Sequence, residues 1–175
     1  MVLFLNFNID ITMNNFNRKG LIINLSIFLI LVLIINGLLF GFGWDTNPDA
    51  ARLKEPYIDP SGTLIGSVWV VLTLILSLAR WLTLEKLTIK QLELRRKITL
   101  LLILCISYPL YTLAISGLVG IYAGLLVNII ILSVIIYILI VNKSLVNRFG
   151  LLVLPVFFWV IFATTVILSE LDIIF

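Results

Sequence analysis

Two tryptophans with apolar and small neighbours at helical spacing are the residues of this sequence whose types best suit ligand binding. Trp69 is followed at steps of three and four residues by Thr73, Leu76, Ser77 and Arg80. Trp159 is followed in the same way by Phe162, Ala163, Val166 and Ile167. Such steps place each set on one stripe of a helix. Small side chains beside an indole leave room for a flat ring to stack on it, so the pattern indicates a site for a planar apolar ligand. The alternative is that both tryptophans only anchor helix ends at a membrane interface, where this residue is common.

Residues that could support catalysis or metal binding are scarce. The chain has no histidine and one cysteine, so the commonest ligand of metals and of haem iron is missing, and no intrachain disulfide can form. No paired carboxylates and no activated nucleophile stand out, so acid–base and covalent catalysis lack candidates. We therefore expect a protein that is not an enzyme and needs neither metal nor cofactor. Light-driven chemistry through tryptophan stays open as a lesser alternative.

The composition indicates that these residues are positioned within a lipid bilayer. The chain is 62% hydrophobic and 12% charged, whereas soluble domains carry about 25% charged residues. The net charge of +3 comes from basic residues scattered between apolar blocks. A nucleic-acid-binding protein would cluster them on one soluble face, so no such partner is expected.

Five segments are long and apolar enough to span a membrane, which requires about 20 residues in a helix. They are Leu21 to Phe42, Leu64 to Leu84, Ile98 to Val119, Ile121 to Val141 and Gly150 to Leu171. Only Gly117 and Gly120 separate the third from the fourth, which predicts a tight hairpin there. The expected fold is an all-α integral membrane bundle of five helices over residues 21–171, after a preamble of residues 1–20. Met13 is a second plausible start, so residues 1–12 need not be native.

Lysine and arginine fall mainly on one side of the predicted spans. Nine lie before the first span, between the second and third, or between the fourth and fifth: Arg18, Lys19, Lys86, Lys90, Arg95, Arg96, Lys97, Lys143 and Arg148. The other side carries two, Arg52 and Lys54. Because cytoplasmic loops retain positive charge, we predict a cytoplasmic N-terminus and a C-terminus outside.

The long loop over residues 43–62 would then lie on the outer side. Prolines at positions 48, 56 and 60 disfavour helix and restrict the residues before them. One interpretation is a solvated connector. The other is a lid over a cavity between the helix ends, with Arg52, Lys54, Pro56 and Pro60 as its residues.

Two groups of residues also carry a resemblance to a known family. The first comprises Leu53, Lys54, Pro56, Pro60, Gly66, Val68, Trp69, Leu72, Ala79 and Trp81. The second lies in LLVLPVFFWVIFATTVIL and comprises Pro155, Trp159, Phe162, Ala163 and Thr164. The chain resembles the tryptophan-rich sensory protein and translocator protein family (TspO/MBR) at these positions. The resemblance implies five spans with a long first outer loop, and a cavity lined by the two tryptophans for a tetrapyrrole such as protoporphyrin.

The sequence departs from the family pattern at several pocket positions. Thr73 and Val156 stand where the family has tyrosines, Ser61 replaces a loop proline, and Asn128 stands at the place of a carboxylate. The third span carries Tyr108 and Pro109 instead of a tryptophan-bearing segment. The family's sterol motif after the fifth span has no counterpart here, so a sterol is not the expected ligand.

The leading hypothesis is a sensory or regulatory membrane protein that holds a planar tetrapyrrole-like ligand. Its predicted binding residues are Trp69, Thr73, Trp159, Phe162, Ala163 and Ile167. The alternative is a structural or accessory membrane subunit that keeps the bundle but not the ligand site. Two Gly-x-x-x-Gly spacings, at Gly37–Gly41 and Gly120–Gly124, allow close helix approach and a possible homodimer.

Overall fold

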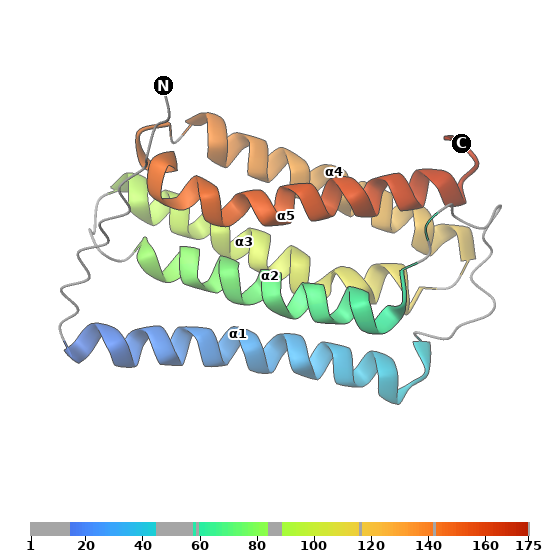
Figure 1. Ribbon diagram of the computed structural model, residues 1–175, viewed down its shortest axis with the longest axis horizontal. Helices are drawn as coiled ribbons and strands as arrows, with labels where there is room; N and C mark the ends of the chain where they lie inside the picture. Colours follow the sequence, from blue (N-terminus) through green and yellow to red (C-terminus); the bar gives the residue numbers. More distant parts are fainter. Residues whose placement is uncertain are drawn as a thin grey trace, which may run out of the picture.

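The computed structural model describes residues 15–44, 58, 60–83, 89–115, 117–141 and 143–174, without the side chains of 15–17 and 141–150. Within these ranges the chain forms five helices: α1 Asn15–Gly41, α2 Gly62–Leu82, α3 Ile89–Thr112, α4 Gly117–Val141 and α5 Lys143–Glu170. Figure 1 shows them side by side along the length of the molecule, with successive helices running in opposite directions. One end of the bundle therefore holds the ends of α1, α3 and α5 and the starts of α2 and α4.

Four of the helices are long and apolar enough to cross a membrane: α1, α2, α4 and α5. Their outward side chains suit lipid, as Ile23, Val71 and Phe158 are 59%, 54% and 64% exposed. In water such an apolar surface would be strongly unfavourable. The helix α3 is not among the four, because its first turns carry Lys90, Glu93 and a run of three basic residues, Arg95–Lys97.

The third helix does not coincide with the predicted third span, because it begins before Ile98 and ends before Val119. Residues Lys90 to Lys97, expected in an inner loop, are helical, and the helix ends at Thr112 rather than near Val119. Hydropathy detects only the part of a helix that lipid can accept. Lysine, arginine, glutamate and leucine are good helix formers, so the helix continues beyond that part. Lys97 Nζ lies 2.7 Å from Glu93 Oε1, one turn away, and 4.0 Å from the centre of the Tyr137 ring, which ties this extension to α4.

The predicted hairpin exists, but it lies before Gly117 rather than between Gly117 and Gly120. Gly117 has φ of 73°, a left-handed conformation that glycine adopts without a steric cost, and α4 begins there. Gly120 belongs to the first turn of α4, where an added Cβ would lie 2.2 Å from the carbonyl oxygen of Ile115. Gly124 follows one turn later, where a Cβ would lie 2.7 Å from Thr112 Cγ2. This Gly-x-x-x-Gly pair thus serves packing within the chain.

The hydrophobic core runs along the axis of the bundle, between neighbouring helices. Adjacent pairs are α1 with α2 and α3, α2 with α3 and α5, and α4 with α3 and α5. The helix α1 contributes a single face, on which Asn24, Phe28, Val32 and Leu39 are buried. The centre is filled by aliphatic side chains with no exposed surface, such as Leu76, Leu101 and Ile135.

A buried polar cluster joins α1 and α2 at the end where α1 begins. Asn24 Nδ2 donates to Ser77 Oγ at 2.7 Å and to the Ser77 carbonyl oxygen at 2.8 Å. Arg80 donates from Nη1 to Asn24 Oδ1 and from Nε to Thr99 Oγ1 at 2.9 Å. The arginine therefore connects three helices by hydrogen bonds.

Replacing Asn24 by leucine should destabilise the bundle by roughly 1–3 kcal/mol, because Arg80 and Ser77 then lose buried hydrogen-bond partners. Thermal unfolding in detergent measures the change. Ser133→Ala is the control, since the exposed Ser133 hydroxyl donates to the carbonyl oxygen of Ile129 in its own helix at 2.7 Å. Equal midpoints for the two variants would contradict the role given to Asn24.

Candidate ligand-binding site

A cavity of about 330 Å³ opens at the end of the bundle where α1, α3 and α5 end. All five helices and the residues before α2 contribute to its wall. The lining residues are Asn36, Leu39, Phe40, Pro60, Ser61, Gly62, Ile65, Gly66, Trp69, Tyr108, Pro109, Thr112, Leu113, Ile121, Trp159, Phe162, Ala163, Val166, Ile167 and Glu170. Most are apolar or aromatic, as in small-molecule pockets generally.

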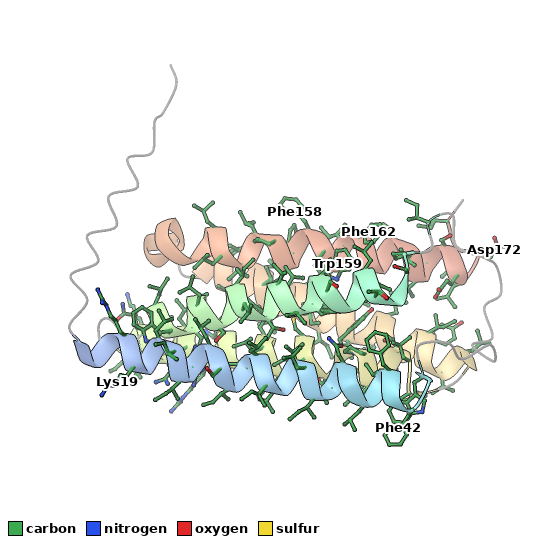
Figure 2. The ribbon with its side chains drawn as sticks, turned by 60° about the horizontal axis from the view of Figure 1, so that its bottom comes forward. Lys19, Phe42, Phe158, Trp159, Phe162 and Asp172 are labelled. Carbon is green, nitrogen blue, oxygen red and sulfur yellow. The ribbon has the colours of Figure 1, made fainter. Side chains whose placement is uncertain are left out.

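Both tryptophans contribute to the wall of this cavity, from different helices. Trp69 of α2 is 1% exposed, and its ring lies 5.1 Å from that of Tyr108, tilted by 39°. Trp159 of α5 lies 5.3 Å from the ring of Phe162, tilted by 40°. Figure 2 shows Trp159 directed toward the other helices, whereas Phe158, its neighbour in sequence, projects outward. The two indoles thus form aromatic surfaces within one hollow.

Most of the predicted site residues come together there. Trp69, Trp159, Phe162, Ala163 and Ile167 all line the cavity, and Pro60 of the predicted lid does so too. Thr73 is fully buried one turn further along α2 and is not part of the lining. The other predicted lid residues, Arg52, Lys54 and Pro56, lie outside the described residues.

The wall also contains residues that sequence analysis did not select for the site. Asn36, Leu39 and Phe40 come from α1, where their spacing of three and four residues was a usable signal. Tyr108, Pro109 and Thr112 come from α3, where a tyrosine–proline pair within an apolar segment was noticed only as a departure from the family pattern. Glu170, at the end of α5, also lines the cavity and adds a carboxylate there.

Several buried polar atoms around the cavity form no hydrogen bond among the described residues. They include Nε1 of Trp69 and of Trp159, which both line the cavity, and Thr73 Oγ1 beneath it. The amide of Asn128, also fully buried, is in the same situation. A buried polar group without a partner costs about 1–3 kcal/mol. The arrangement therefore favours occupants, water or ligand, that bring hydrogen-bond acceptors to the two indole N–H groups.

A comparison with protein-family models identifies the family of the chain. The model of the TspO/MBR family matches residues 5–169, nearly the whole chain. The chain belongs to the TspO/MBR family. Neither the comparison with curated proteins nor that with solved structures gives a match.

Membership of the TspO/MBR family agrees with the helices described above. Together with the four helices that could cross a membrane, it makes the chain a multi-pass integral membrane protein of the TspO type. Its environment is the lipid bilayer, which accounts for the exposed isoleucine, leucine and phenylalanine side chains on the outer faces.

Proposed function

We propose that this TspO-type protein holds a planar hydrophobic ligand of the porphyrin class between Trp69 and Trp159 and acts as a sensory or regulatory receptor rather than as an enzyme. The observation that supports the proposal is that these two indoles, 90 positions apart in the sequence, line one cavity. Aromatic rings stack on one another with about 0.5–1.5 kcal/mol beyond the effect of burial. Burial of the ligand's apolar surface adds about 25 cal/mol per Å².

The size of the cavity constrains how such a ligand would sit. A volume of about 330 Å³ is near the lower end of the 300–1,000 Å³ range of small-molecule pockets. A tetrapyrrole would therefore enter edge-on and project from the mouth toward the 43–62 loop. In that position Arg52 and Lys54 would meet its propionates through charge-assisted hydrogen bonds.

The proposal includes an orientation in the membrane. With 24 residues, α3 has a length of about 36 Å at about 1.5 Å per residue, enough to serve as a fifth span with its charged first turns at the surface. The end of the bundle with the cavity would then face outward and the basic end inward. Cysteine labelling tests this orientation. Single cysteines are placed at positions 18 and 172 in a chain that lacks Cys105, and each is labelled from either side of sealed vesicles.

Filling the cavity tests the proposed function. Ala163→Phe should weaken binding of protoporphyrin IX roughly ten-fold or more, because its ring occupies the space that the ligand needs. The matched control is Ile161→Phe on the outer face of the same helix, where Ile161 is 38% exposed. Absorbance titration of the porphyrin in detergent measures both.

The outcomes separate a receptor from an accessory subunit. Binding lost in A163F and kept in I161F supports the proposed site. If the wild-type protein does not bind the porphyrin, or both variants bind as the wild type does, the cavity is not a porphyrin site. Stoichiometric co-purification with another membrane protein would then favour the accessory subunit.

A further inference from the structure

The end of the bundle opposite the cavity holds two neighbouring arginines, Arg80 of α2 and Arg95 of α3. Arg80 Nε donates to Thr99 Oγ1 at 2.9 Å, and Thr99 Oγ1 donates to the carbonyl oxygen of Arg95 at 2.7 Å. Arg95 and Thr99 are four residues apart, so they lie on one face of α3. Through Thr99, the guanidinium of Arg80 is thus linked to the backbone of Arg95.

The site is built by the fold rather than formed by loose surface side chains. Arg80 is held by Asn24 on one side and by Thr99 on the other, and its guanidinium lies 5.3 Å from the centre of the Phe28 ring. Arg95 Nε is buried and has no hydrogen-bond partner among the described residues. A guanidinium has five N–H donors, so within the part of the chain that the structure describes this pair retains donors without a partner.

No acidic group of the described residues balances the pair. Among the residues whose side chains the structure describes, this end carries seven basic ones, Arg18, Lys19, Arg80, Lys90, Arg95, Arg96 and Lys97, and one acidic one, Glu93. Glu93 is taken by Lys97 at 2.7 Å. Two like charges at a partly dehydrated site are unfavourable, and an anion bound between them would relieve the repulsion.

The depth of the pair in the bilayer indicates which anion is available. Trp81, the residue after Arg80, lies beside the first turns of α1, since a Cβ on Gly20 would be 3.6 Å from its indole nitrogen. Tryptophans are enriched at the headgroup level. Lys19, labelled at the start of α1 in Figure 2, is exposed at the same end. These neighbours indicate a depth at the level of the lipid phosphates for the arginine pair.

We propose that Arg80 and Arg95 form a binding site for the phosphodiester group of an anionic membrane lipid. The planar guanidinium matches phosphate oxygens through paired hydrogen bonds. The acyl chains would follow the outer face of α3 toward the bilayer centre, where Leu100 and Ile103 are 46% and 56% exposed. The site is separate from the cavity and does not depend on what the cavity binds.

Native mass spectrometry of the full chain, taken from mixed micelles of phosphatidylcholine and phosphatidylglycerol, tests the site. The wild-type protein should retain one phosphatidylglycerol molecule in preference to phosphatidylcholine. Arg95→Gln should reduce that retention roughly ten-fold, because the lipid phosphate loses a charged partner with paired hydrogen-bond donors. Arg95 Nε forms no hydrogen bond with the part of the chain that the structure describes, so the variant should remain folded. Arg80→Lys keeps the charge but loses the paired donors, and it should weaken retention as well.

A charge-matched pair of variants separates a built site from a basic surface. R80Q/R95Q and K90Q/R96Q each remove two positive charges from the same end, but Lys90 and Arg96 are exposed. Retention lost only in the first supports the site, whereas equal loss in both, or in neither, overturns it. If inorganic phosphate stabilises the lipid-free protein to the same extent as phosphatidylglycerol does, the ligand is a free anion rather than a lipid. The variant E85Q tests an acidic residue outside the described ranges. Increased lipid retention in this variant would show that the Glu85 carboxylate neutralises the positive charge of the arginine pair.

Discussion

Replacing both Trp69 and Trp159 by leucine should weaken binding of protoporphyrin IX roughly ten- to hundred-fold. Each indole contributes about 0.5–1.5 kcal/mol of stacking to the ligand, so the two together account for about 1–3 kcal/mol. Leucine keeps the walls of the cavity apolar, so the bundle should remain folded. The Soret absorbance of the ligand is the appropriate measurement, because tryptophan fluorescence would disappear with the residues themselves.

The control for this double variant is Trp81→Leu, which removes a tryptophan from the opposite end of α2. It should leave the affinity for the porphyrin unchanged. A similar loss in the control would mean that the porphyrin binds tryptophans non-specifically or at the membrane interface. Unchanged affinity in the double variant would exclude the cavity as the site.

Gly120→Ala should be among the most destabilising single substitutions in the helices. Its Cβ would lie 2.2 Å from the carbonyl oxygen of Ile115 and 3.3 Å from that of Tyr111. Both are backbone atoms, so the turn between α3 and α4 would have to move as a whole. Overpacking of this kind costs about 1–3 kcal/mol or more, and each kcal/mol lowers the midpoint of thermal unfolding by about 2–4 °C.

Gly37→Ala is the matched control, since Gly37 is also within a helix but a Cβ there meets nothing within 4 Å. It should be neutral or stabilise the protein by up to about 1 kcal/mol, because alanine is the better helix former. A destabilised G37A in lipid, together with loss of a dimer, would show instead that Gly37 and Gly41 pack against a second copy of the chain. That result would support the homodimer predicted from the Gly-x-x-x-Gly spacing.

The sequence determined the membrane class and most of the helices because both depend on local composition. Runs of about 20 apolar residues have few alternatives to a helix in lipid, where every backbone polar group must be bonded within its own segment. Charged segments are not restricted in this way, because water can satisfy their backbone polar groups in a helix or in a loop. Residues Lys90 to Lys97 were expected in a loop, yet they form the first turns of α3, because helix formation continues in water where hydropathy no longer reports on it.

Local sequence patterns also predicted part of the candidate site, whereas the rest depends on contacts between helices. The one-stripe spacing on α2 and α5 was sufficient to select Trp69, Trp159, Phe162, Ala163 and Ile167, because residues three and four apart must share a helix face. It also selected Thr73, which lies on that face but beneath the cavity, since a stripe has no marker of depth.

Only the tertiary structure decided which faces meet. It brought Asn36, Phe40 and Tyr108 to the cavity from α1 and α3, and it bonded Arg80 to Asn24 and Thr99, 56 and 19 positions away. A helix sequence specifies its own faces, but the partner of each face depends on how all five helices pack together, which is a property of the whole chain.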